Sequence, residues 1–264
     1  MSRILALALL LTGCPAPHDT SADTGAPSGE VTIAQIAEED AEGHAVLAGQ
    51  VVTTRGIATA ASGVLGGRKL RIHLQADGAG CAVDADEVVA AEIVGAIGDL
   101  LEGDELLITG LVTQQDLASN EDSAVEDGLT RVRIEDSTRV VRLSAGNPLP
   151  EPLGLSLPDI LAGGDTWEGL LVRLDDVHKV AQFADTWVTS LDSSTVVDVQ
   201  DADGAGPLKV RLGNGERTGG YGDDPGTAAF SLIGLLREDT TNPPESDPDG
   251  SSFEVWPRSE DDIL

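Results

Sequence analysis

Short stretches in which apolar and polar residues alternate recur along most of the chain, and this period of two is typical of half-buried β-strands. The clearest stretch is residues 70–74, in which Leu70, Ile72 and Leu74 alternate with Arg71 and His73. Similar patterns predict further strands at residues 44–54, 105–113, 131–143, 170–180, 187–191, 196–200, 208–212, 228–236 and 253–256. We therefore expect an all-β fold with little helix.

Two stretches do not alternate. Residues 87–101 have apolar positions at mixed spacing and predict a short helix, and residues 31–39 predict a short amphipathic opening segment. Within the predicted strand 105–113, we expect Gly110 to interrupt the pairing, because a glycine inside a strand often marks an irregularity.

Residues 144–153 contain three prolines and cannot continue a sheet, because proline has no backbone N–H to donate. We place a domain boundary here, between residues 31–145 and residues 146–264. Each half holds about five predicted strands, and in each half an acidic loop precedes the closing strand. This weak internal repeat favours two tandem five-stranded barrels. A single β-sandwich is the alternative.

The N-terminus has the layout of a secretory signal peptide. Arg3 is followed by an apolar run over residues 4–11, which is far shorter than the ~20 residues that span a bilayer. The run ends in Leu-Thr-Gly followed by Cys14, which resembles the lipobox of bacterial lipoproteins. The resemblance implies that residues 1–13 are removed and that Cys14 carries the lipid that anchors the chain to a membrane.

Residues 14–30 are small, polar and rich in turn formers, a composition that cannot build a core. We interpret them as a disordered tether behind the lipid. The resemblance to lipoproteins places the protein in the bacterial cell envelope. Pro15 stands where an aspartate would signal retention in the inner membrane, so the outer membrane is favoured.

Three later segments resemble the accessory β domains of large secreted bacterial nucleases. They are Gly-Asn-Pro-Leu-Pro-Glu-Pro-Leu at 146–153, Trp-Glu-Gly-Leu-Leu-Val-Arg-Leu at 167–174, and Phe-Glu-Val-Trp-Pro-Arg-Ser-Glu-Asp-Asp-Ile at 253–263. In those nucleases, OB-fold-like domains precede a catalytic domain of the endonuclease/exonuclease/phosphatase type. The resemblance implies two OB-fold-like barrels here, without the catalytic domain, and fold alone does not assign a function.

The formal net charge of −30 produces a field that repels phosphate backbones. Residues 31–143 contain no Phe, Tyr or Trp, although binders of single strands stack bases on aromatic side chains. Both observations argue against nucleic acid as a partner. Adaptation of an exposed surface to salt is the simpler explanation of the charge.

Candidate ligand-binding residues gather where an OB barrel would bind, on its second strand: Arg68, Lys69, Arg71 and His73. Neutralisation of nearby acid on a solvent face is the alternative role for these cations. In the second half Trp187 and Tyr221 lie near predicted loops, where they can stack on a sugar or a protein partner. Core packing is the alternative for both aromatic residues.

Catalytic and metal motifs are weak. No histidine has metal-ligand spacing or a nucleophile motif beside it, so a hydrolase would need His73 or His178 to meet distant partners in the fold. Asp201 and Asp203 are followed by Gly204 and suggest a Ca²⁺ loop, but the far glutamate of such a loop is missing. An ordinary turn is the alternative.

Lipid on Cys14 leaves Cys81 without a partner, so we expect no intramolecular disulfide and a small buried side chain at Cys81. The sequence as a whole predicts a non-enzymatic binding module anchored at the envelope, with a protein or a carbohydrate as ligand. The alternatives are a nucleic-acid-binding accessory to an extracellular nuclease and a hydrolase with an unrecognised site.

Overall fold

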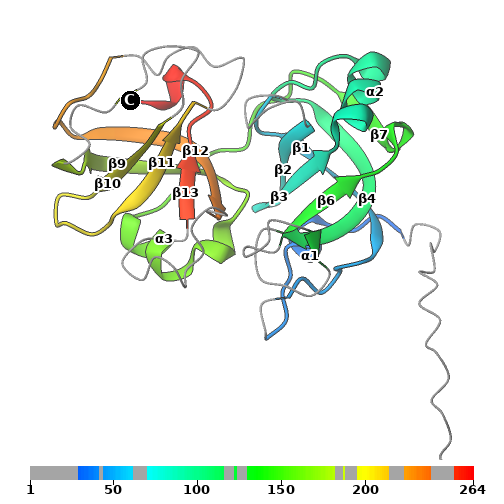
Figure 1. Cartoon of the computed structure of the whole chain (residues 1–264), viewed down its shortest axis with the longest axis horizontal. Helices are drawn as coiled ribbons and strands as arrows, with labels where there is room; N and C mark the ends of the chain where they lie inside the picture. The colour runs from blue at the N-terminus through cyan, green and yellow to red at the C-terminus, as the bar shows by residue number, and fades with distance from the viewer. Residues whose placement is uncertain are drawn as a thin grey trace, which may run out of the picture.

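The computed structural model describes residues 29–41, 44–61, 70–115, 122–123, 130–181, 187, 195–213, 223–238 and 253–264. Two β-barrels lie side by side, with only short helices around them (Figure 1). The predicted fold class, all-β with two tandem OB-fold-like barrels, is confirmed, and the alternative of a single sandwich is not. Within the described residues, no helix is long and apolar enough to cross a bilayer.

The first barrel closes through antiparallel pairing of its first and fourth strands. Around the barrel the order is β1-β2-β3-β6-β4, and β3 runs parallel to β6. The helix α2 connects β3 to β4, and this arrangement is that of an OB fold. The short strands β5 and β7 add to β4. The bounds are β1 (Val51–Ala58), β2 (Leu70–Ala76), β3 (Ala79–Ala85), α2 (Glu87–Ile97), β4 (Glu105–Gln115), β5 (Asp122–Ser123), β6 (Thr130–Ile134) and β7 (Val140–Ser144).

The second barrel repeats this topology. Its order is β10-β11-β13-β12-β9, β10 pairs with β9 to close it, and β11 runs parallel to β13. The bounds are β9 (Leu171–Lys179), β10 (Thr195–Gln200), β11 (Leu208–Leu212), β12 (Phe230–Glu238) and β13 (Phe253–Trp256). The short 3₁₀ helix η4 (Glu260–Asp262) follows β13.

Each barrel is also preceded by the same lead-in. An extended segment pairs in parallel with the first strand, at Glu30 on β1 and at β8 (Leu153–Gly154) on β9. A short helix follows, α1 (Ile33–Ile36) or α3 (Leu157–Gly163), and each buries two apolar side chains three residues apart. Both helices begin with reciprocal side-chain capping, between Thr32 and Gln35 and between Ser156 and Asp159. The internal repeat is therefore more extensive than the strands alone.

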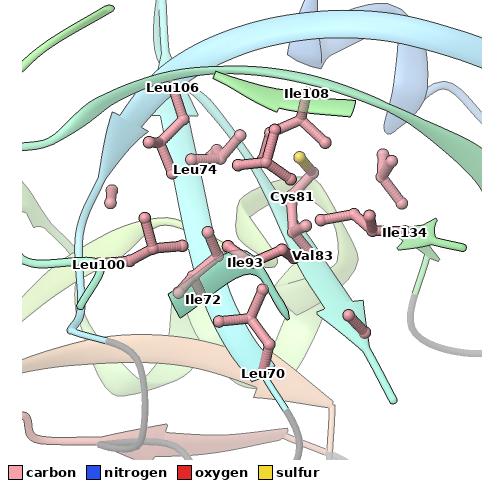
Figure 2. Close-up of a cluster of buried hydrophobic side chains, with 14 of the residues drawn as sticks. Leu70, Ile72, Leu74, Cys81, Val83, Ile93, Leu100, Leu106, Ile108 and Ile134 are labelled. Carbon is pink, nitrogen blue, oxygen red and sulfur yellow. The ribbon is translucent and has the colours of Figure 1, made fainter. Parts of the chain in front are cut away.

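Aliphatic side chains from all sides fill the interior of the first barrel. Figure 2 shows Ile72 and Leu74 of β2 pointing into the same cluster as Ile93 of α2 and Leu106 of β4. Cys81 lies among them as a free thiol with 3% of its surface exposed, as predicted for a small buried side chain. The second barrel has a separate core that includes two phenylalanine side chains, those of residues 230 and 253.

Several predicted elements change in the structure. The first strand begins at Val51 rather than at residue 44, because residues 46–49 form a turn and Ala45 donates its N–H to Gln114 Oε1. β4 continues through Gly110, where a Cβ would lie 2.6 Å from the carbonyl oxygen of Arg133. The glycine therefore allows β6 to approach. Residues 131–143 form β6 and β7, separated by the 3₁₀ turn η1 (Ser137–Arg139).

Candidate functional site

The second barrel covers the outer face of β2 and β3 in the first barrel. Gly80 of β3 lies against Gly169, and a Cβ on Gly169 would be 2.8 Å from the Gly80 carbonyl carbon. Beside this contact, Ala60 packs with Leu171, Leu235 and Trp256 of the second barrel. We call this contact between the barrels the junction. OB barrels commonly bind ligands on the face of their second and third strands, so the junction occupies that face of the first barrel.

Polar contacts add specificity to the junction. Leu171 donates its backbone N–H to Gln75 Oε1 at 3.1 Å, and this amide side chain is 5% exposed. Arg258 donates to the carbonyl of Thr59 and to Glu102, both at 3.2 Å, while the same guanidinium is held by Asp262 at 2.7 Å. The end of the second barrel is therefore fixed to the loop after β1 and to the turn before β4.

Arginine side chains surround one indole at the junction. The guanidinium carbons of Arg237 and Arg211 lie 4.6 and 5.3 Å from the ring centroid of Trp256, within range of cation–π attraction. Arg211 Nε donates to Glu254 Oε2 at 2.8 Å. The strands β11, β12 and β13 present these side chains outward, because their alternate residues fill the barrel core.

Burial and like charges shift the ionisation of this group. Burial, reinforced by the charge of Arg71, lowers the pKa of Arg237 to about 10. Burial lowers the pKa of His73 well below its usual value, and the charges of Arg237 and Arg71 act in the same direction. Burial raises the pKa of Glu254 against the opposing effect of Arg211. The junction therefore holds a neutral histidine beside a crowded set of cations.

The corresponding face of the second barrel lies on β10 and β11. Val197, Val199, Leu208 and Val210 fill the core. The intervening side chains therefore point outward, and all of them are half-buried: Val196, Asp198, Gln200, Lys209 and Arg211. We call these five residues the β10–β11 face. It carries two cations and one carboxylate, in a chain whose net charge is −30.

The structure places the predicted ligand-binding residues in different surroundings. Arg71 is half-buried at the margin of the junction, whereas His73 is 2% exposed within it. Trp187 packs edge-on against Phe230 at 6.0 Å and lies under the ammonium of Lys179 at 5.4 Å, so one side of the ring is part of the second barrel. Arg68, Lys69, Tyr221 and the lipidation residue Cys14 lie outside the described residues.

The predicted metal residues form a turn between β10 and β11. Asp201 Oδ1 accepts the backbone N–H groups of Asp203 and Ala205 at 3.0 and 2.8 Å. These bonds satisfy an ordinary turn and use an oxygen that a Ca²⁺ ion would need. Among the residues that the structure describes, no three histidine, cysteine or acidic side chains gather as metal ligands would.

The two histidines considered for catalysis have few polar contacts. His73 Nδ1 has no hydrogen-bond partner, and His178 Nδ1 lies 3.4 Å from the carbonyl oxygen of Thr227.

Burial raises the pKa of the Cys81 thiol to about 12, so a thiolate is disfavoured there.

Two clefts flank the first barrel, and neither is lined by His73 or His178. A cleft of about 280 Å³ lies between β3 and the second barrel, with Glu39 and Glu168 on its walls. A groove of about 700 Å³ lies between the lead-in segment at Thr32, the strand residue Arg55, and the linker at Pro148. Acidic side chains border both of them.

The cluster of arginine side chains around Trp256 was not predicted as a site from the sequence. Arg211, Arg237, Glu254 and Trp256 come from three strands that meet only in the folded barrel. The sequence contains a signal for part of it, since Ile233, Leu235 and Arg237 share the outward side of β12. Two apolar residues on an outward side indicate that something covers that side.

No model of a protein family matches the chain, and no curated protein is significantly similar to it. Solved structures with similar folds include asparaginyl-tRNA synthetase from Pyrococcus horikoshii, with 17% identity and a TM-score of 0.30 over 42% of this chain and 23% of that one. Aspartyl-tRNA synthetase from Entamoeba histolytica has 15% identity and a TM-score of 0.32, over 61% of this chain and 31% of that one. A replication protein A heterotrimer bound to ssDNA has 12% identity and a TM-score of 0.32, over 70% of this chain and 44% of that one. This chain thus covers less than half of each.

These neighbours correct one prediction. The sequence argued against nucleic acid as a partner, yet a protein of similar fold is described with ssDNA bound. The prediction was wrong because it relied on the charge of the whole chain. The net charge of a whole chain does not determine the charge of one face, and the β10–β11 face carries Lys209 and Arg211 with one carboxylate, Asp198.

Proposed function

We propose that this protein is a binding module of the bacterial cell envelope, held by lipid on Cys14 and presenting the β10–β11 face to its ligand. The observation that carries the proposal is the asymmetry between the barrels. The first barrel uses its β2–β3 face to hold the second barrel, through contacts such as Gly80 with Gly169 and Leu171 with Gln75. The equivalent face of the second barrel remains half-exposed.

The anchoring part of the proposal rests on residues 1–14 of the sequence and the tether that follows. Acyl chains contribute about 0.8 kcal/mol per buried methylene, and stable anchoring takes more than one chain. Replacing Cys14→Ala should leave a chain that carries no lipid and separates with the soluble fraction. Mass spectrometry and membrane fractionation measure both. A Cys14→Ala protein that stays in the membrane fraction would reject the lipid anchor.

The ligand is tested on the second barrel. Titration of the isotope-labelled protein with a candidate ligand, followed by NMR, should perturb backbone signals of β10 and β11 before those of β2 and β3. A single-stranded oligonucleotide and soluble envelope polysaccharide are the first two probes. If every perturbed signal belongs to the first barrel, the β10–β11 face is not the site.

A narrower candidate is an accessory that holds single-stranded nucleic acid for an extracellular nuclease. It is favoured by Lys209 and Arg211 on the half-exposed face, because a positive groove is what sequence-independent single-strand binding needs. Oligonucleotide binding should weaken with salt and with Lys209→Glu, but should be less affected by Arg139→Glu on η1. Binding that is absent at low salt would reject this candidate while leaving other ligands to be tested.

A further inference from the structure

We infer that the junction contains an anion site, in which Arg71, Arg211 and Arg237 receive a phosphate group. The site lies beside the β10–β11 face and shares Arg211 with it. Its existence does not depend on the proposed function, because it is defined by the side chains at the contact between the barrels.

Charge is the first argument. Arg237 interacts with the cations Arg71 and Arg211 and with the carboxylates Glu254 and Glu168. Burial opposes the charged form of Arg237, and the two neighbouring guanidiniums add to this effect. Among the groups that act on Arg237, the guanidiniums are not outnumbered by the carboxylates, in a protein that otherwise has a large excess of acids. An anion bound among the guanidiniums would offset their mutual repulsion.

Unused hydrogen-bonding capacity is the second argument. Arg237 is 5% exposed and its Nε has no partner, and His73 is 2% exposed with no partner for Nδ1. Buried polar atoms are rarely left without partners, so two at one contact call for an explanation. A phosphate oxygen accepts hydrogen bonds from guanidinium N–H groups and from an imidazole N–H.

Access and chemistry give the third argument. Arg71 is half-buried and the Arg211 side chain is 20% exposed, so an ion can reach the group from solvent. The Trp256 ring, contacted by Arg211 and Arg237, helps to fix the two guanidiniums in place. Planar guanidiniums with several donors are the side chains that recognise phosphate best. We therefore assign phosphate, either free or as part of a larger ligand.

Arg71→Gln is the sharpest test, because this residue lies at the margin of the junction. The variant removes a charge that disfavours protonated His73 and Arg237. Without phosphate, it should therefore be as stable as the wild type or more stable. An arginine whose role is only to support the fold would give a loss instead. Arg139→Gln, on an exposed 3₁₀ turn of the first barrel, is the matched control.

Inorganic phosphate should raise the Tm of the wild type and of Arg139→Gln above that in chloride of equal ionic strength. It should raise the Tm of Arg71→Gln much less, with an affinity for phosphate at least about tenfold weaker. Phosphate should also raise the pKa of His73, measured by NMR, because an anion favours the charged imidazolium. Equal responses of wild type and Arg71→Gln, or an unchanged pKa of His73, would overturn the assignment.

A parallel titration with a nucleoside monophosphate identifies the source of the phosphate. Tighter binding than that of inorganic phosphate assigns the site to a phosphate ester on a larger ligand, whereas equal binding assigns it to the free ion. In both cases, the Arg71→Gln substitution must weaken the binding. The outcome is separate from the proposed function, since that function is tested by the backbone signals of β10 and β11, whereas phosphate binding is tested by Arg71→Gln on β2.

Discussion

Gly80 and Gly169 lie main chain against main chain where the two barrels meet, and neither position has room for a side chain. We expect Gly80→Ala to lower the free energy of unfolding by about 1–3 kcal/mol, because a methyl group would force the barrels apart. Urea unfolding measures the loss, and small-angle scattering detects the change in shape. Gly154→Ala is the control, since its Cβ would meet no atom within 4 Å. Equal stability of the two variants would show that the contact yields easily.

Arg258 also joins the two barrels, through its hydrogen bonds to Thr59 and Glu102. Arg258→Met should destabilise the protein by on the order of 3 kcal/mol, because Asp262 would be left buried without its cation. Arg173→Met removes an exposed pair with Asp175 and should have no measurable effect. Urea unfolding at neutral pH provides the comparison. Similar losses in both variants would mean that burial of Asp262 does not determine the energy.

His73 should make stability depend on pH. Its pKa in the folded protein is lowered from 6.5, so the unfolded chain takes up the proton at higher pH than the folded protein does. The contribution of neutral His73 is therefore complete above pH 6.5 and is lost as the pH falls through the lowered pKa. His73→Gln should flatten the dependence below pH 6.5. Glu102 and Glu254, whose pKa values are raised, act in the opposite direction and are present in both proteins.

Cys81 should be inert in the native state. The thiol is buried and its pKa is about 12, so little thiolate is present at neutral pH. In a Cys14→Ala background, where Cys81 is the remaining cysteine, a thiol reagent should label the protein only after urea unfolds it. Rapid labelling in buffer would indicate that the first barrel opens frequently. Cys81→Ser should cost about 1–3 kcal/mol, because its hydroxyl would enter an apolar core.

Alternation along the strands predicted the barrels well but not their contact. In β2 the pattern correctly assigned Ile72 and Leu74 to the core, yet it could not tell that His73 and Gln75, on the other side, would be covered. Period two separates the sides of a strand and carries no information on what lies beyond either side. β3 was missed because small residues such as Gly80 weaken the pattern, and that same glycine allows the barrels to approach.

The anion site could not be read from the sequence for a related reason. Arg71 and Arg237 lie in different barrels, and only the junction brings their charges together. The total charge of −30 pointed away from any anion. The capping pairs Thr32–Gln35 and Ser156–Asp159 differ in this respect, because both partners are close neighbours in the sequence.

The route of the chain through the junction has a consequence for biosynthesis. The strands of the first barrel are complete at β7, whereas Trp256, which packs on Ala60, and Arg258, which binds Thr59 and Glu102, follow near the end of the second barrel. A nascent first barrel therefore leaves Ala60 without the contact of Trp256 until the last strand has been synthesised. Chains that stall before β13 would expose this apolar surface, which is the kind of feature that quality-control proteases recognise.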